Sequence, residues 1–536
     1  MGRWRVIAVL GAAQFVMVLD TTVMNVSIGQ VVEDLGTDVV RMQLAITAYT
    51  LVMAAFMLTG AKLGDILGRR RALTIGLAVY GAGSLCTALA PGIEVLLLGW
   101  SVLEGLGAAL VIPAIASLTA GNYSGRQRAL AYGILGGIAG AGAALGPLIG
   151  GWMTTTLSWR LVFAAEVVII GVILLTIRIV REDGAERDRS GLDAAGVLLS
   201  AGGMILVVLA VLQSSQWGWV EATSPPVVAG TRIAPFGFSP VPFLIAGGIG
   251  LLVAFGRWQE RRAAAGRSTL LAPGLLRTPQ LRAGAVMLTA QQVIVGGVFF
   301  VLPLYLQVVL GKDALDTGIA TLPLSVGLFV FALTGARLSS LAAPRSIVRA
   351  GLGAMLLAAV VLFSTIDLEL NELGFAAGLL LVGAGLGLLA SQLGNVIMSA
   401  VPDSRSAEAG GVQGTAQNLG ASVGTALVGA VLIAGLTTAL QANVRANPVL
   451  TPQVVAAVER ATERGVDLLP AATVADLATR AGLPAAQVAG VVDAYQDAQI
   501  RALKRSLAVV AVFVLIGFTV TRRLPARRLT EQAPPD

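Results

Sequence analysis

The stretch GAKLGDILGRRRAL, residues 60–73, joins two long apolar segments and places Asp65 and three consecutive arginines, residues 69–71, in the connection. Such a charged connection is compatible with a soluble turn between buried helices or with a loop at a membrane surface. Of the 536 residues, 56% are hydrophobic and 12% are charged, and the mean hydropathy is +0.82. Soluble domains carry about 25% charged residues. The composition therefore favours a membrane protein in which residues 60–73 form a loop.

Fourteen apolar segments have a length suited to a membrane-spanning helix, which needs about 20 mostly apolar residues. Most of the 37 lysines and arginines lie in the connections on the side of the N-terminus, and lysines and arginines mark the cytoplasmic side. The sequence therefore predicts an all-α integral membrane protein with fourteen transmembrane helices and both termini in the cytoplasm. The predicted segments are residues 6–28, 43–62, 72–90, 93–119, 129–153, 161–180, 193–213, 241–256, 283–310, 317–338, 346–366, 372–401, 409–438 and 506–524.

Two motifs recur eight predicted helices apart and indicate an internal repeat. GAKLG at 60–64 returns as GARLS at 335–339, and the glycine-rich run at 136–151 returns at 410–424. Transporters often arise from such repeats, with the substrate site between them. We expect six-helix bundles at 1–180 and 283–524, two extra helices within 181–282, and a cytoplasmic tail at 525–536. The loop at 439–505 should form short amphipathic helices over the outer face.

The residues that are rare or missing exclude several kinds of chemistry. Cys86 is the one cysteine, so no intrachain disulfide can form, and the absence of histidine excludes a histidine metal site. Proton chemistry must then use carboxylates. The net charge of +7 comes from short basic clusters between apolar runs, which favours a lipid bilayer over nucleic acid as the partner.

The charged connection contains features that suit a conformational gate. Gly60 and Gly64 permit close helix contact, and Gly68 permits a tight turn. Asp65 follows at the end of a helix whose dipole disfavours a carboxylate, so it needs a partner, such as Arg128 or a helix N-terminus near 404–408. Arg69 and Arg70 should hold the loop at the inner surface. The pattern resembles the signature loop of the major facilitator superfamily, GxLaDrxGrrxxl.

Three further motifs resemble the fourteen-helix drug/proton antiporters of that superfamily. LDTTVMNVSI at 19–28 is similar to the helix 1 signature, although Gly29 stands where the family has proline, and WRLVF at 159–163 is similar to the opening of helix 6. GAALGPLIGG at 142–151 is similar to the antiporter signature. Its stripe of Gly142, Gly146 and Gly150, with a bend at Pro147, suits helices that rock against each other.

The resemblance implies a bacterial plasma-membrane transporter that exports small lipophilic molecules in exchange for protons by alternating access. It implies a monomer that needs no cofactor and is driven by the proton gradient. Other functions remain possible from the sequence alone. An importer or facilitator of a specific metabolite on the same fold is the main alternative, and the antiporter signature argues against it. A membrane-embedded enzyme would need a cluster of polar catalytic groups at one membrane face, and the sequence shows no such cluster. A sensor would usually need a soluble output domain, and the sequence shows none.

The embedded carboxylates Asp20 and Glu104 are the candidates for proton coupling. The family's helix 4 arginine is replaced by Ser101, its glutamine by Glu104, and the asparagine after WRLVF by Glu166. Asp20 and Glu104 should lie at similar depths, about 12 and 16 Å from the outer surface. Two close carboxylates resist double ionisation and would share a proton. The alternatives are a structural hydrogen bond at Asp20 and a permanently neutral Glu104.

A substrate cavity between the two bundles is the last expectation from the sequence. Met17 and Met24 share a helix face with Asp20, and methionine suits varied apolar ligands, although such stripes are more often plain packing. Polar and aromatic residues on other helices are also candidates, with helix bridging as the alternative role. The predicted substrate-binding residues are Met17, Met24, Asn25, Gln291, Gln292, Phe299, Phe300, Tyr305, Gln392 and Asn395.

Overall fold

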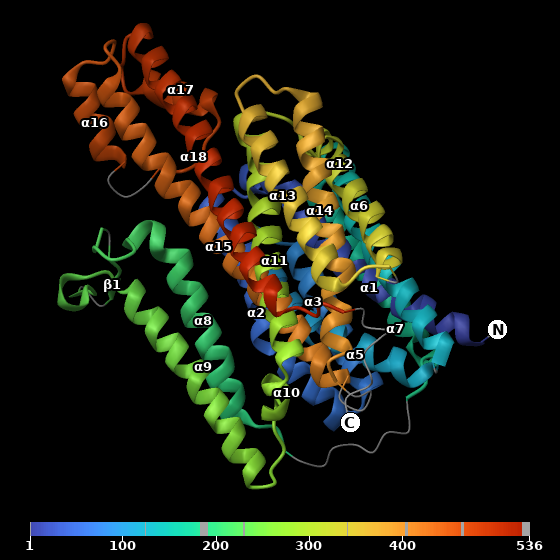
Figure 1. Ribbon diagram of the computed structural model, residues 1–536. Helices are drawn as coiled ribbons and strands as arrows, with labels where there is room; N and C mark the ends of the chain where they lie inside the picture. Colours follow the sequence, from blue (N-terminus) through green and yellow to red (C-terminus); the bar gives the residue numbers. More distant parts are fainter. Residues whose placement is uncertain are drawn as a thin grey trace.

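A computed structural model describes residues 2–123, 125–182, 191–223, 225–228, 231–339, 341–401, 406–462 and 466–527. These residues are almost entirely helical (Figure 1). Each of the fourteen predicted segments lies largely within a helix. Twelve helices of the described residues are long and apolar enough to cross a membrane, and α3 and α6 are not among them. An all-helical, multi-pass membrane protein is confirmed, whereas fourteen spans and cytoplasmic termini remain predictions.

The N-terminal half is a bundle whose helices change direction at short turns. Asp38 caps α2 by accepting the Arg41 N–H at 2.7 Å, and Gly68, at φ 100°, separates α2 from α3. The elements are α1 (Gly2–Asp34), α2 (Val39–Leu67), α3 (Arg69–Ala88), α4 (Ile93–Leu96), the π-helical segment η1 (Leu97–Glu104), α5 (Gly105–Asn122), α6 (Gly125–Thr156), α7 (Trp159–Thr176) and η2 (Ile177–Ile179).

The C-terminal half repeats this arrangement and then extends beyond it. Its elements are α10 (Pro273–Arg277), α11 (Pro279–Leu304), the π-helical η4 (Tyr305–Val309), α12 (Ala314–Leu338), α13 (Pro344–Thr365), α14 (Glu372–Met398), α15 (Ser406–Ala446), α16 (Pro452–Thr462), α17 (Ala471–Arg480), α18 (Ala485–Val520) and η6 (Thr521–Arg523).

The segment 439–505 differs from the sequence expectation. The short helix α16 forms as predicted and α17 is a second short helix, but residues 485–505 belong to the single long helix α18, and α15 continues to Ala446. The pair α16 and α17 packs on these extensions, which project beyond the bundle in Figure 1. Tyr495 on α18 fixes the connection between α16 and α17, because its hydroxyl accepts the Leu469 N–H and donates to the Asp467 carbonyl.

The two extra helices form a hairpin beside the bundles, seen in green in Figure 1. They are α8 (Ala194–Trp217) and α9 (Val241–Ala264), joined through β1 (Val227–Val228), β2 (Thr231–Arg232) and η3 (Pro235–Gly237). The helix α8 packs against both α2 and α15, where Val208, Val211 and Leu212 meet Ala426. The hairpin therefore covers a seam where the two halves meet.

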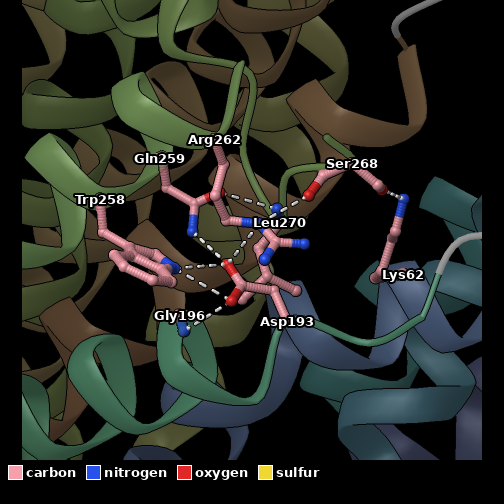
Figure 2. Close-up of polar contacts among 8 residues, drawn as sticks. All are labelled: Lys62, Asp193, Gly196, Trp258, Gln259, Arg262, Ser268 and Leu270. Carbon is pink, nitrogen blue, oxygen red and sulfur yellow. Dashed lines mark hydrogen bonds and ion pairs between the residues drawn. The ribbon is translucent and has the colours of Figure 1, made fainter. Parts of the chain in front are cut away.

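Asp193 anchors the hairpin at the end away from its strands (Figure 2). It caps α8 through the Gly196 N–H and accepts hydrogen bonds from Trp258 and Gln259 on α9. Arg262 lies 3.5 Å from Asp193 and also donates to the Ser268 carbonyl. Lys62 of α2 donates to the Ser268 hydroxyl, so the connection after α9 is held against the N-terminal bundle.

Candidate functional site

A cavity of about 490 Å³ lies between the two halves of the molecule. It is bordered by α1, α2, η1 and α5 of the first half and by α11, α12, α14 and α15 of the second. Its described lining carries amides, threonines, aromatic and aliphatic groups, and no charged side chain. The amides among them are Gln14, Asn25, Gln291, Gln292, Gln413, Gln417 and Asn418.

Half of the predicted substrate-binding residues reach this cavity. Its lining includes Met17, Asn25, Gln291, Gln292 and Phe299. Their role in binding substrate remains a prediction, but their position is compatible with it.

The other predicted binding residues lie elsewhere, so their placement in the cavity was wrong. Met24 and Phe300 are fully packed in the core. Tyr305 packs on Phe375 and donates its hydroxyl to the Asp367 carbonyl at 2.6 Å. Gln392 donates to the Gly335 carbonyl at 2.9 Å. The side chain of Asn395 is exposed outside the described lining of the cavity.

Three fully buried carboxylates meet inside the N-terminal half. Asp20 of α1, Glu104 of η1 and Glu166 of α7 each have a carboxylate oxygen within 4.8 Å of the others. The sequence placed Asp20 and Glu104 at similar depth, and the structure brings them together. Glu166 is the member that the sequence did not assign, although its substitution for the family asparagine was a signal. We call these three residues the carboxylate cluster.

Each member of the carboxylate cluster has different hydrogen-bond donors. Trp100 donates its indole N–H to both oxygens of Asp20, at 2.9 and 3.1 Å. Thr87 donates to Glu104 at 3.3 Å, and Ser84 donates to Glu166 at 3.1 Å. The second oxygens of Glu104 and Glu166 are buried with no hydrogen-bond partner among the described residues.

Close backbone contact between α3 and η1 brings these groups together. A Cβ on Gly83 would lie 2.6 Å from the Gly99 carbonyl oxygen and from the Glu104 side chain, so only glycine fits there. The contact places Ser84 and Thr87 beside the carboxylates. The π-helical turn of η1 adds a residue to the helical ladder, and such turns are frequent at functional sites.

An aromatic pair separates the carboxylate cluster from the cavity. Tyr49 and Trp100 stack with ring centres 5.0 Å apart and planes at 4°, and both line the cavity. Asp20 lies behind them with no exposed surface. Ser101, which stands at the family's arginine position, donates to the Ala45 carbonyl at 2.8 Å and supplies no charge.

The charged connection at 60–73 is not the loop that the sequence predicted: residues 60–67 end α2, Gly68 forms the turn, and residues 69–73 begin α3. Asp65 forms an ion pair with Arg69 at 3.9 Å, and Arg69 also reaches the Ser117 carbonyl at 3.4 Å. Arg70 reaches the Val180 carbonyl at 3.5 Å. Residues 404 and 405 and the side chain of Arg128, which the sequence suggested as partners of Asp65, lie outside the described residues. The gating role of the connection remains a prediction.

The predicted glycine stripes pack at helix crossings. A Cβ on Gly146 would lie 1.8 Å from the Thr22 hydroxyl, and Gly142 and Gly150 face Val18 and Val23 of α1 in the same way. Pro147 lies within α6, where its carbonyl faces Gly318 of α12. On α2, a Cβ at Gly60 would lie 2.0 Å from the Ala109 carbonyl oxygen, whereas Gly64 has room for one.

Gly29 explains a departure from the family motif. Its N–H donates to Gln307 Oε1 at 2.8 Å, and Gln307 donates to the Val26 carbonyl at 2.8 Å. A proline at position 29 would have no N–H to donate. A Cβ there would lie 2.7 Å from Gln307 Oε1. Gln307 therefore bridges α1 and η4 and closes one end of the interface between the halves.

Comparison with known proteins agrees with this architecture. The chain is 31% identical to the puromycin resistance protein pur8 of Streptomyces alboniger, over 78% of this chain and 80% of that protein. It is 29% identical to a probable actinorhodin transporter of Streptomyces coelicolor, over 78% and 70%. It is 27% identical to the multidrug efflux pump LfrA of Mycolicibacterium smegmatis, over 78% of each.

Solved structures support the fold. A bacterial homologue of the human lysosomal transporter Spinster, in an inward-facing and unoccupied conformation, aligns with a TM-score of 0.60 at 14% identity, over 100% of this chain and 99% of that one. The family model of the Major Facilitator Superfamily matches residues 10–425. The motifs, the two-bundle fold and these matches show that the chain belongs to the Major Facilitator Superfamily, a family of membrane transporters.

Proposed function

We propose that this protein exports lipophilic small molecules from a bacterial cell in exchange for protons, by alternating access in the plasma membrane. The observation that carries this proposal is an uncharged cavity between two bundles with a sealed carboxylate cluster against its wall. A cavity at the interface of the two halves can open to either side as the halves rock. We propose that it works as a monomer and needs no cofactor beyond the proton gradient.

The lining supports substrates that combine apolar surface with neutral hydrogen-bonding groups. Phe299, Met17 and Met53 offer apolar surface, and the amides offer donors and acceptors. Polar groups in such a pocket orient a ligand through hydrogen bonds, and the apolar groups bind its hydrophobic surface. Relatives named for puromycin, actinorhodin and multidrug efflux support natural antibiotics and similar compounds as the substrate class.

The carboxylate cluster supports proton coupling. Three carboxylates in a buried site cannot all be ionised without a large cost in free energy, so at least one should hold a proton. A proton held there can be exchanged as the bundles rock. In this proposal Asp20 and Glu104 couple proton entry to substrate export.

Drug susceptibility in a bacterium that lacks its own efflux pumps tests this function. Expression should raise resistance to puromycin and to lipophilic dyes, and a protonophore should remove the gain. Phe299→Ala should reduce resistance, whereas Phe363→Ala, at an exposed position on α13, should not. Greater susceptibility and greater uptake on expression would instead identify an importer.

A further inference from the structure

The three members of the carboxylate cluster differ in how well their charged forms are satisfied. Asp20 accepts the Trp100 N–H on both oxygens, and the Tyr49 hydroxyl approaches it, whereas the Tyr80 hydroxyl approaches both Asp20 and Glu104. Hydrogen bonds to a carboxylate favour its ionised form. Asp20 is therefore the member best prepared to remain an anion.

Glu104 and Glu166 have fewer well-aligned donors than Asp20. Glu104 is 3.3 Å from the Thr87 hydroxyl, which lies closer to the Gly83 carbonyl at 2.9 Å, and Glu166 accepts from Ser84. The other oxygen, Glu104 Oε2 or Glu166 Oε1, has no partner among the described residues. An ionised oxygen left unpaired in the interior is costly. A protonated oxygen instead carries an O–H, which can donate to a neighbouring carboxylate. The neutral acid therefore suits both residues.

Among the described residues, no lysine or arginine adjoins the carboxylate cluster to change this balance. The surrounding helices contribute Asp20 from α1, Tyr49 from α2, Tyr80 from α3, Glu104 from η1 and Glu166 from α7. The hydroxyls of Tyr49 and Tyr80 lie near the cluster and are buried with no hydrogen-bond partner among the described residues, so the site holds further unsatisfied polar atoms.

From these contacts we infer that Glu104 and Glu166 carry the exchangeable protons, two per transport cycle, while Asp20 remains the anion that receives their hydrogen bonds. This inference rests on the proposed function. The sequence indicated Asp20 and Glu104 as the carriers of the exchangeable proton, whereas the structure favours Glu104 and Glu166. Loading forms one O–H bond on each glutamate. The protons come from water on loading. Release breaks both O–H bonds and passes the protons back to water; the Tyr49–Trp100 stack must separate for this, so that water reaches the cluster and solvates the three carboxylates.

Infrared spectroscopy of the purified protein in lipid tests the assignment without a transport assay. A protonated carboxyl group has a C=O stretching band distinct from that of a carboxylate. At neutral pH, Glu104→Gln and Glu166→Gln should each remove half of the band from buried protonated carboxyls, and the double variant should remove it. Asp20→Asn should leave it in place. Glu94→Gln, which changes a glutamate with an exposed side chain close before η1, is the matched control and should change nothing.

Other results would overturn the inference. Loss of the band in Asp20→Asn, with no loss in Glu166→Gln, would return the proton to Asp20. Loss of the band on adding sodium at constant pH would show that the cluster binds a metal cation instead. Size-exclusion profiles establish that each variant is folded, and the separate Glu104→Gln and Glu166→Gln variants give two independent tests.

Proton stoichiometry in proteoliposomes provides a second readout. The membrane potential at which net transport of a neutral substrate reverses reports protons per substrate. Glu166→Gln should halve that ratio, and an unchanged ratio would contradict the inference. A protein that shows the infrared bands but exports no tested drug would keep the assignment and refute the proposed function, so the two failures can be distinguished.

Discussion

Trp100 donates its indole N–H to both carboxylate oxygens of Asp20 while its ring stacks on Tyr49 at the wall of the cavity. One residue therefore contacts both the space available to a substrate and the buried carboxylate cluster. A ligand that displaces the ring would also weaken the hydrogen bonds to Asp20. Trp100 is therefore a direct structural connection between the cavity and the carboxylate cluster.

Replacing Trp100 with phenylalanine should uncouple transport from the proton gradient. The variant keeps an aromatic ring against Tyr49 but removes the donor to a buried carboxylate, a loss of about 1–3 kcal/mol. Uphill export in proteoliposomes should fall at least about fivefold, the factor that corresponds to the lower end of that range. Trp258→Phe removes a similar indole–aspartate bond in the extra hairpin and is the matched control. Equal losses in the two variants would argue against a coupling role for Trp100.

Replacing Gln307 with alanine should open the end of the interface that it bridges. The variant loses the hydrogen bonds to Gly29 and Val26, each worth about 1 kcal/mol. In a Cys86→Ser background, a cysteine at Phe299 should react with an impermeant maleimide up to about thirtyfold faster from that side, the factor that corresponds to about 2 kcal/mol. Gln280→Ala is the control, because Gln280 bonds to Val396 and Ser399 within its own half. An unchanged labelling rate would show that Gln307 does not hold this end closed.

Replacing Gly146 with alanine should separate α1 from α6. The new methyl group would lie 1.8 Å from the Thr22 hydroxyl, and such overpacking costs about 1–3 kcal/mol. Thermal unfolding in detergent should occur at a lower temperature, and transport should fall. Gly137→Ala changes a glycine of the same helix that has open space beside it. Stability should be unchanged or slightly higher in that control, and a similar loss would refute the packing argument.

Removing the charge of Asp193 should loosen the extra hairpin in a pH-dependent way. Burial raises the pKa of Asp193, but hydrogen bonds from Trp258, Gly196 and Gln259 and the charge of Arg262 outweigh it and lower the pKa from 3.8. A lowered pKa stabilises the folded state above 3.8, and this contribution disappears as the pH falls through the lower folded value.

The test compares the thermal unfolding temperature of the Asp193→Asn variant with that of the wild-type protein, from neutral pH to a pH below 3.8. The variant should unfold at a lower temperature at neutral pH, by a loss of about 1–3 kcal/mol, and the difference should shrink in acid. Asp313→Asn, which alters another aspartate cap with one backbone donor, should have a smaller effect. A difference that is independent of pH would show that the charge is not what holds the hairpin.

Features set by local chemistry could be predicted from the sequence. Long apolar runs must be helical in a bilayer because their backbone polar groups have no other partners there, and the basic clusters at their ends indicated the loops. The glycines of the stripe at 142–150 were recognised from spacing alone. The proximity of Asp20 and Glu104 could be predicted because depth along a helix follows from the number of residues, while their role in proton coupling stays a prediction.

Features that depend on helix rotation and on contacts between distant segments required the tertiary structure. Phe299 and Phe300 are neighbours about 100° apart on one helix, so only Phe299 faces the cavity. Glu166 joins the carboxylate cluster because α7 packs on α3, a contact between segments far apart in the chain. Spacing along the sequence specifies neither helix rotation nor partner. The division of the three carboxylates into one anion and two acids is therefore a property of their packed surroundings.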